Sequence, residues 1–178
     1  MDEKELSKYL STFDSADEKI NSYLVDNAVT DEIRWRSRTY LFISSEGNNR
    51  DILAYFTILQ KSIMIDEQVT LSKSMTKKLN PDEDNIAQCR LIGHLGRSTK
   101  TEKGFGAVVL GYAVSLSNEL AKREGCRVVR IDCTPGKLEE YYADHGFITA
   151  SMNNDKDLAQ MILLLDKIFD ADRSRHSS

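Results

Sequence analysis

Glycines and basic residues gather in one segment of the chain that has the chemistry to bind a phosphate group. The segment covers residues 95–106 and reads LGRSTKTEKGFG. Glycine lets the backbone approach a ligand closely, and the unpaired amides and the dipole at a helix N-terminus attract anions such as pyrophosphate. Arg97, Lys100 and Lys103 can add charge-assisted contacts. The segment therefore predicts an anion site where a strand passes into a helix.

Two common nucleotide-binding motifs do not fit this segment. No GxGxxG follows the strand, which disfavours a dinucleotide site, and no GK[ST] ending is present, which excludes a Walker loop. Two glycines near a helix start can also be an ordinary turn with solvated lysines. The neighbouring elements have to decide between a binding turn and an ordinary one.

The elements around the segment alternate between strand and helix. Residues 104–123 predict the longest helix, because apolar residues recur there every three or four positions, Tyr112 among them. Residues 6–13 fit either a short helix or an edge strand, and Asp14 and Ser15 are candidate caps for two short helices within 16–38. Further short helices are expected within 71–84 and at 138–145, and strands at 39–43, 52–59, 87–95, 128–133 and 147–152. Residues 158–169 fit either a buried strand or a helix, and a strand is preferred. The order predicts an α/β (α+β) domain whose mixed sheet carries helices on both faces.

The composition is that of an ordinary globular protein. Of 178 residues, 40% are hydrophobic and 29% charged, which predicts a single domain over 1–170 followed by a polar tail at 171–178. The acidic, polar N-terminus and the lack of a long apolar stretch predict a cytoplasmic protein without a membrane segment. Three cysteines without a CxxC pair signal neither disulfides nor a metal site. The net charge of -4 argues against bulk attraction to nucleic acid.

A second motif follows about thirty residues after the glycine turn. The strand VVRIDC (128–133) leads into LEEYYADHGF (138–147), in which a YYxxxGF pattern joins a short helix to the next strand. The order of strand, glycine turn, long helix, strand and YYxxxGF junction resembles the GNAT superfamily of acetyl-CoA-dependent N-acetyltransferases. The resemblance covers about 39–165, with its specific part at 92–147. It implies a mostly antiparallel central sheet and acetyl-CoA as the acetyl donor.

The resemblance also implies a role for particular residues. Tyr142 is expected to be the general acid that protonates the departing thiolate, with Tyr141 facing the core. Thr101 stands where the family usually has Gln or Arg, so the loop departs from the family there. Amides near Leu95 and Gly96 would polarise the thioester carbonyl. The residues expected to bind the coenzyme are Leu95, Gly96, Arg97, Lys103, Gly104, Phe105 and Gly106.

Other polar residues leave alternatives open. The base that removes the proton of the amine could be Glu67, His94 or Asp132. Cys133 could be a nucleophile with His94 or His145 beside it, although a small buried side chain is the simpler interpretation. Trp35 could belong to an interface or acceptor surface, and is otherwise expected to anchor a helix to the sheet.

The early helices together with the YYxxxGF junction resemble small bacterial GNAT proteins, which include the acetyltransferase toxins of toxin-antitoxin modules. This implies aminoacyl-tRNA as one acceptor, with a protein amine or a small amine as others. It also implies an antitoxin and a second copy of the chain as partners. The rival hypothesis is a non-catalytic acyl-CoA-binding or partner-binding module, which the unusual Thr101 loop would suit.

Overall fold

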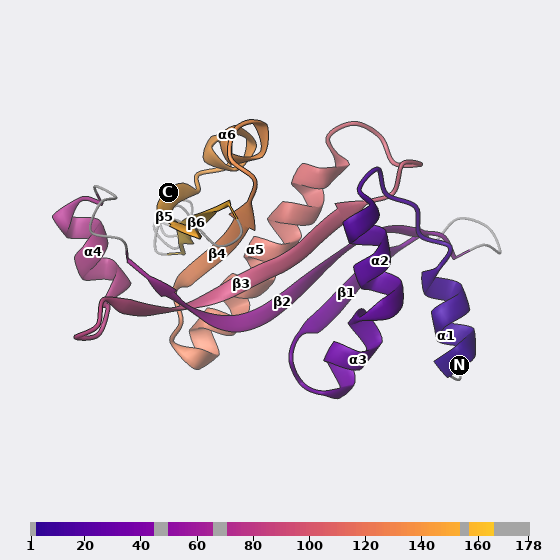
Figure 1. Cartoon of the computed structure of the whole chain (residues 1–178), viewed down its shortest axis with the longest axis horizontal. Coiled ribbons are helices and arrows are strands. Elements are labelled where there is room, and N and C mark those ends of the chain that lie inside the picture. Colours follow the sequence, from indigo (N-terminus) through magenta and orange to yellow (C-terminus); the bar gives the residue numbers. More distant parts are fainter. Residues whose placement is uncertain (1–2, 45–49, 66–70, 154–156, 166–178) are drawn as a thin grey trace, which may run out of the picture. The chain divides into compact units, whose positions relative to one another are not determined.

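The computed structural model describes residues 3–44, 50–65, 71–153 and 157–165 (Figure 1). Six strands form one sheet in the order β1-β2-β3-β4-β6-β5. The pairs β1/β2, β4/β6 and β5/β6 are antiparallel, which confirms the expected mixed, mostly antiparallel sheet. The elements are α1 (Glu3–Leu10), α2 (Glu18–Asp26), α3 (Ala28–Ile33), β1 (Arg38–Ile43), β2 (Ile52–Met64), α4 (Lys73–Leu79), β3 (Ile86–Arg97), α5 (Phe105–Glu124), β4 (Val128–Cys133), α6 (Lys137–Asp144), β5 (Ile148–Asn153) and β6 (Leu158–Leu164).

The chain divides into two compact units, residues 1–59 with 92–115 and residues 60–91 with 116–178. The prediction of one domain over 1–170 stays a prediction. The end of the last expected strand after residue 165 and the polar tail lie outside the described residues. No helix in the described ranges is long and apolar enough to cross a membrane.

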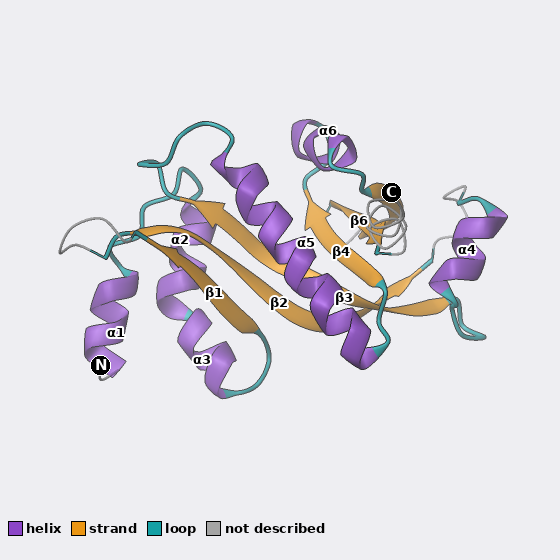
Figure 2. Ribbon diagram, turned by 180° about the vertical axis from the view of Figure 1, so that it is seen from behind, coloured by secondary structure: helices purple, strands orange, loops and turns teal. Residues whose placement is uncertain are grey.

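In the first unit, helices α1 to α3 pack on one face of the sheet, and the first half of α5 lies on the other face (Figures 1 and 2). The N-terminal segment is therefore helical, not an edge strand. The cap of α2 is Asp17, whose carboxylate accepts from the amide of Lys19 at 2.9 Å, so the expected cap at Asp14 or Ser15 was wrong. The apolar contacts between these helices and the sheet come from Leu10, Phe13, Leu24, Ala28, Ile52 and Tyr55.

Helix α2 sits very close to strand β3. A Cβ placed on Gly96 would lie 2.3 Å from the Cγ2 of Ile20, which is much closer than atoms can approach. The buried Tyr55 donates its hydroxyl to the main-chain carbonyl of Ile20 at 2.7 Å. Glycine at position 96 therefore lets the helix reach the sheet, and the tyrosine bond fixes it there.

Helix α5 faces the sheet with a stripe that differs from the expected one by one position. Val109, Leu110 and Ala113 are buried, whereas Tyr112 is 61% exposed. Successive residues of a helix are turned by about 100° from one another, so a stripe centred on 109 and 113 leaves 112 at its edge. The Tyr112 ring instead contacts the edge of Phe42 in β1, with centroids 5.2 Å apart.

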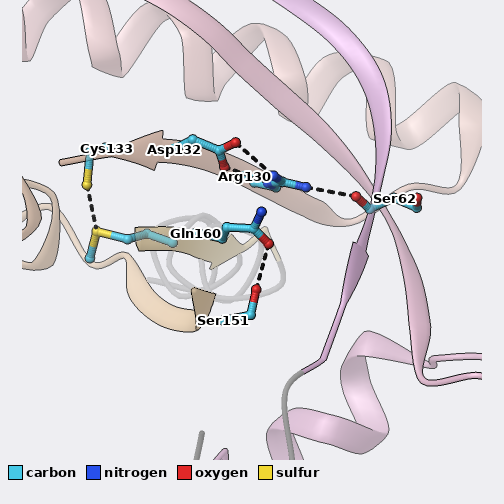
Figure 3. A network of polar contacts seen from close by, with 7 residues as sticks. Ser62, Arg130, Asp132, Cys133, Ser151 and Gln160 are labelled. Atoms are coloured by element: carbon cyan, nitrogen blue, oxygen red, sulfur yellow. Dashed lines mark hydrogen bonds and ion pairs between the residues drawn. The ribbon is translucent and has the colours of Figure 1, made fainter. Parts of the chain in front are cut away.

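The second unit has its own apolar core, shared by β2, β3, β4, β5, β6 and α4. Helix α6 packs against β5 and β6. The guanidinium of Arg130 on β4 binds both carboxylate oxygens of Asp132, at 2.6 and 2.7 Å, and donates to the carbonyl of Ser62 at 2.8 Å (Figure 3). The core residues are Ile63, Ile65, Leu79, Ala87, Cys89, Val128, Ala150, Ile162 and Leu164.

Candidate functional site

The glycine-bearing loop of the first unit is held at its start by main-chain bonds. The amide of Ser98 donates to the carbonyl of Leu53, and the amide of Thr99 donates to the carbonyl of Asp14, each at 2.8 Å. The Thr99 hydroxyl also donates to the Asp14 carboxylate at 2.7 Å. Asp14, expected to cap a helix, therefore fixes the start of the loop instead.

Thr101, the residue that departs from the family pattern, closes the loop on itself. Its amide and its hydroxyl both donate to the carbonyl of Ser98, at 3.0 and 2.7 Å. Arg97 donates to the carbonyl of Thr101 at 3.1 Å. Thr101 therefore stabilises the loop conformation, and the Arg97 guanidinium, expected on the ligand, already holds the loop with one of its nitrogens.

The turn into α5 presents main-chain amides to an open space. Gly104 has φ of 97°, a conformation that side chains disfavour, and a Cβ on it would meet no atom within 4 Å. Within the described residues, no hydrogen-bond acceptor is found for the amides of Lys103, Gly104 and Gly106, whereas the amide of Phe105 donates to the carbonyl of Glu102 at 3.2 Å.

The first turn of the helix has no acidic residue that would repel an anion. Of the four residues expected to bind the coenzyme at this turn, Lys103, Gly104 and Gly106 each offer a free amide. The helix dipole favours an anion at the same place. The arrangement suits a phosphate group.

Strand β3 is irregular just before the loop. A Cβ on Gly93 would lie 3.1 Å from the Thr57 hydroxyl, and one on Gly96 would lie 3.6 Å from the ring of Tyr55. Tyr55 and Thr57 are two residues apart on β2, so their side chains lie on the same face of the sheet. Gly93 and Gly96 are three residues apart, and in a regular strand they would face opposite sides. The pleat of β3 is therefore interrupted between the two glycines. In keeping with this, the amide of His94 donates to the side chain of Thr57 at 2.9 Å.

His94 lies at this irregularity within a set of buried and half-buried polar groups. Its ring stacks on Tyr23 of α2, with centroids 3.5 Å apart and planes 14° from parallel. Its Nδ1 is 3.5 Å from the hydroxyl of Thr57, which is fully buried. The Tyr23 hydroxyl in turn bonds Asp31 and Ser37, each at 3.2 Å. Residues from α2, α3, β2 and β3 are thus brought together around one imidazole.

The environment keeps this imidazole neutral. Burial lowers the pKa of His94, and the carboxylate of Asp31 opposes that shift only in part. A neutral imidazole has one nitrogen that can accept a proton. His94 is therefore suited to act as a base near neutral pH.

The other two candidate bases are Asp132 and Glu67. Both oxygens of Asp132 are bound by Arg130, which makes the pair a structural ion pair (Figure 3). Burial lowers the pKa of Arg130, but the hydrogen bonds and charge of Asp132 more than offset this, so the net shift is upward. Glu67 lies outside the described residues.

Tyr142 lies in the second unit, on α6, and is 8% exposed. Its ring meets the edges of Phe147 and Tyr141, at centroid distances of 5.9 and 5.2 Å. Burial raises the pKa of Tyr142, with smaller contributions from Cys133 and Tyr141. The hydroxyl therefore stays protonated, as a general acid requires. Tyr141 is only half-buried, so the expectation that it, and not Tyr142, faces the core was wrong.

The structure opposes one of the roles proposed for Cys133 and one of those proposed for Trp35. Cys133 is buried and lies against the sulfur of Met161 at 3.7 Å, and burial raises the pKa of its thiol, which opposes a nucleophilic role. Its second candidate partner, His145, is exposed at the end of α6 and bonds the carbonyl of Tyr141 at 2.7 Å. Trp35 is 83% exposed and lies beyond α3, so it does not anchor a helix to the sheet.

Comparison with solved structures identifies proteins of the same fold. A structure of AtaT complexed with acetyl-methionyl-tRNAfMet superposes with a TM-score of 0.75 at 19% identity, over 89% of this chain and 89% of that one. A tyrosine-to-phenylalanine mutant of KacT gives 0.76 at 17% identity over 91% of each chain. AtaTR bound with AcCoA gives 0.67 at 18% identity, over 89% and 87%. This chain has their fold. The GNAT-like architecture expected from the sequence is thereby confirmed, although no family model and no curated sequence matches the chain.

The sequence pointed to His94 but not to the residues around it. Tyr23 and Ser37 lie in segments that carry no motif, and Thr57 looks like any β-branched residue of a strand. The one available signal was a hydroxyl in the middle of the apolar run ILAYFTIL, since buried hydroxyls require a partner.

Proposed function

We propose that the protein transfers an acetyl group from acetyl-CoA to a primary amine by direct attack. The observation that carries the proposal is the open turn at the start of α5, where the amides of Lys103, Gly104 and Gly106 can receive the coenzyme pyrophosphate. It is supported by the shared fold with AtaTR, whose structure is bound with AcCoA.

In the proposed reaction the nitrogen of the amine attacks the thioester carbonyl. Amides of Leu95 and Gly96, at the irregular end of β3, stabilise the charge that develops on oxygen. The C–N bond forms, the C–S bond breaks, and the coenzyme leaves as a thiolate that takes the proton of the Tyr142 hydroxyl. His94 takes the proton lost by the amine, directly or through water. No acyl-enzyme forms.

For the acceptor we propose an aminoacyl-tRNA. The AtaT structure contains an acetylated methionyl-tRNA, and the antitoxin AtaR is bound to AtaT in others. By extension an antitoxin is a candidate partner of this chain, and we propose that it acts in the cytoplasm of a bacterium. A second copy of the chain stays a prediction.

Calorimetric titration of acetyl-CoA, followed by a thiol-release assay with charged tRNA, a peptide amine and a polyamine, tests the proposal. The wild type should bind acetyl-CoA and release thiol with charged tRNA. Tyr142→Phe should keep the affinity and lose turnover by about two orders of magnitude or more, the range of general acid catalysis. Tyr141→Phe, next to it on α6, is the matched control and should keep turnover.

Each failure has a distinct meaning. A wild type that binds no acetyl-CoA would refute the acetyltransferase. Binding without thiol release for any amine would leave an acyl-CoA-binding module, and turnover with the polyamine alone would correct the acceptor.

A further inference from the structure

The segment that follows α3 presents an aromatic side chain to solvent. Trp35 is the only tryptophan of the chain and is 83% exposed. Its neighbour Ile33 is 68% exposed. Single exposed apolar residues are common, but a tryptophan left almost fully in water contributes little to folding. Its presence there calls for another cause.

The backbone at Trp35 adopts a conformation that a large side chain disfavours. The amide of Arg36 donates to the carbonyl of Asp31 at 2.8 Å, and the amide of Trp35 donates to the carbonyl of Glu32 at 3.2 Å. These two bonds form a Schellman motif, in which the residue after the helix cap is left-handed and usually glycine. Trp35 occupies that position with φ of 57°. A bulky residue held in this region is an outlier that points to function.

One face of the indole is already covered by a fixed cation. The guanidinium carbon of Arg38 lies 4.3 Å from the ring centroid. Glu32 holds that guanidinium at 2.7 Å through its carboxylate and at 3.2 Å through its carbonyl. The stack is therefore preorganised, and the high exposure of the ring means that its opposite face is open.

Two more arginines, Arg34 and Arg36, flank Trp35 in the sequence. Arg36 pairs with Asp31 at 3.5 Å but keeps 61% of its side chain exposed. Arg34 is exposed, and no ion pair involving it is seen in the described part of the chain. We call Arg34, Trp35, Arg36 and Arg38 the Trp35 platform.

A flat ring that is backed by a cation, with exposed arginines on either side of it in the sequence, matches a base and its phosphates. Bases of single-stranded RNA stack on aromatic rings, and arginine binds phosphate oxygens. We propose that the Trp35 platform binds an unpaired segment of RNA, with a base on the open face of the indole and phosphates on Arg34 and Arg36. An acidic protein segment would use the arginines but would leave the flat face unused. The inference rests on the proposed function in one respect, since it adds a contact for an acceptor carried on RNA.

The single tryptophan gives a direct measurement. A single-stranded RNA of about eight nucleotides, within the usual site size for such binding, is titrated while the fluorescence of Trp35 is followed. Stacking should quench the fluorescence in a saturable way, and rising salt should weaken the binding. The same RNA carrying a dye gives the affinity of variants by anisotropy.

Three variants separate the contributions. Trp35→Ala should bind the RNA about tenfold more weakly or worse, from the usual contribution of one stacked base. Arg34→Ala should weaken binding and reduce its salt dependence. Tyr112→Ala is the matched control, because that ring is also exposed but lies on α5, and its affinity should not change. Urea unfolding verifies that each variant is folded.

Several outcomes would overturn the inference. These are unchanged fluorescence on adding RNA, equal affinity of Trp35→Ala and wild type, or competition by polyglutamate as strong as that by RNA. The titration needs no acetyl-CoA, so the two proposals fail separately. A wild type that binds acetyl-CoA but no RNA refutes the platform alone, whereas one that binds RNA but no acetyl-CoA refutes the acetyltransferase alone.

Discussion

The turn at Gly104 allows a test in which backbone strain and ligand contact are separated. Gly104 and Gly125 both have positive φ, 97° and 80°, and a Cβ on either would meet no atom within 4 Å. Alanine at either position should therefore cost about 1–2 kcal/mol of unfolding free energy through its backbone conformation alone. The two variants should have similar urea midpoints.

Only one of them should affect the coenzyme. The methyl group of Gly104→Ala would occupy the open space in front of the free amides, where we place the pyrophosphate. Losing a hydrogen bond to a charged group costs about 1.5–3 kcal/mol, which corresponds to about 10- to 150-fold weaker binding of acetyl-CoA. Gly125→Ala should bind as the wild type does. Calorimetry with acetyl-CoA measures both affinities.

An equal loss of affinity in both variants would mean that strain acts at a distance, and the argument from open amides would be wrong. Wild-type affinity in a folded Gly104→Ala would place the pyrophosphate elsewhere.

Three further predictions concern stability. Gly96→Ala should destabilise the fold by about 1–3 kcal/mol by overpacking against Ile20, and adding Ile20→Ala should recover part of the loss in urea unfolding; a simple sum of the two losses would contradict the contact. Burial lowers the pKa of His94, so the free energy of unfolding should have its full value above about pH 6.5 and fall below that pH, where the unfolded chain takes up a proton. His94→Gln should flatten the dependence of this free energy on pH, and an identical dependence in the variant would refute the prediction. Arg130→Met should cost about 3–5 kcal/mol by leaving Asp132 unpaired, whereas Arg130→Met combined with Asp132→Leu should be near neutral in the same assay.

Periodicity predicted which elements form but not which side chain of each faces inward. The strands, α5 and the junction at α6 followed from apolar spacing and from glycine positions, because these depend on neighbouring residues alone. Tyr141 and Tyr142 are adjacent on one helix turn, so either could face the core, and only packing on β5 and β6 decides. The exposure of Tyr112 has a similar cause, since a turn of about 100° per residue moves it to the edge of the buried stripe of α5.

The parts of the site that the sequence did not predict depend on contacts between distant segments. His94 is positioned by Tyr23 and Thr57, from a helix and a strand that lie far from it in sequence. For Trp35 the sequence left two roles open, an exposed surface and an anchor of a helix to the sheet. Its backbone conformation could not be predicted, because a left-handed tryptophan is too rare for propensity to indicate.

The Schellman motif at the end of α3 also matters for anyone who redesigns this chain. Glycine at position 35 would adopt the left-handed conformation without a side-chain penalty, and Trp35→Gly should raise the free energy of unfolding by about 1 kcal/mol. A redesign guided by stability alone would therefore replace the tryptophan early, and the thermostable product would have lost the only indole of its surface. Position 35 is one at which stability and recognition select different amino acids.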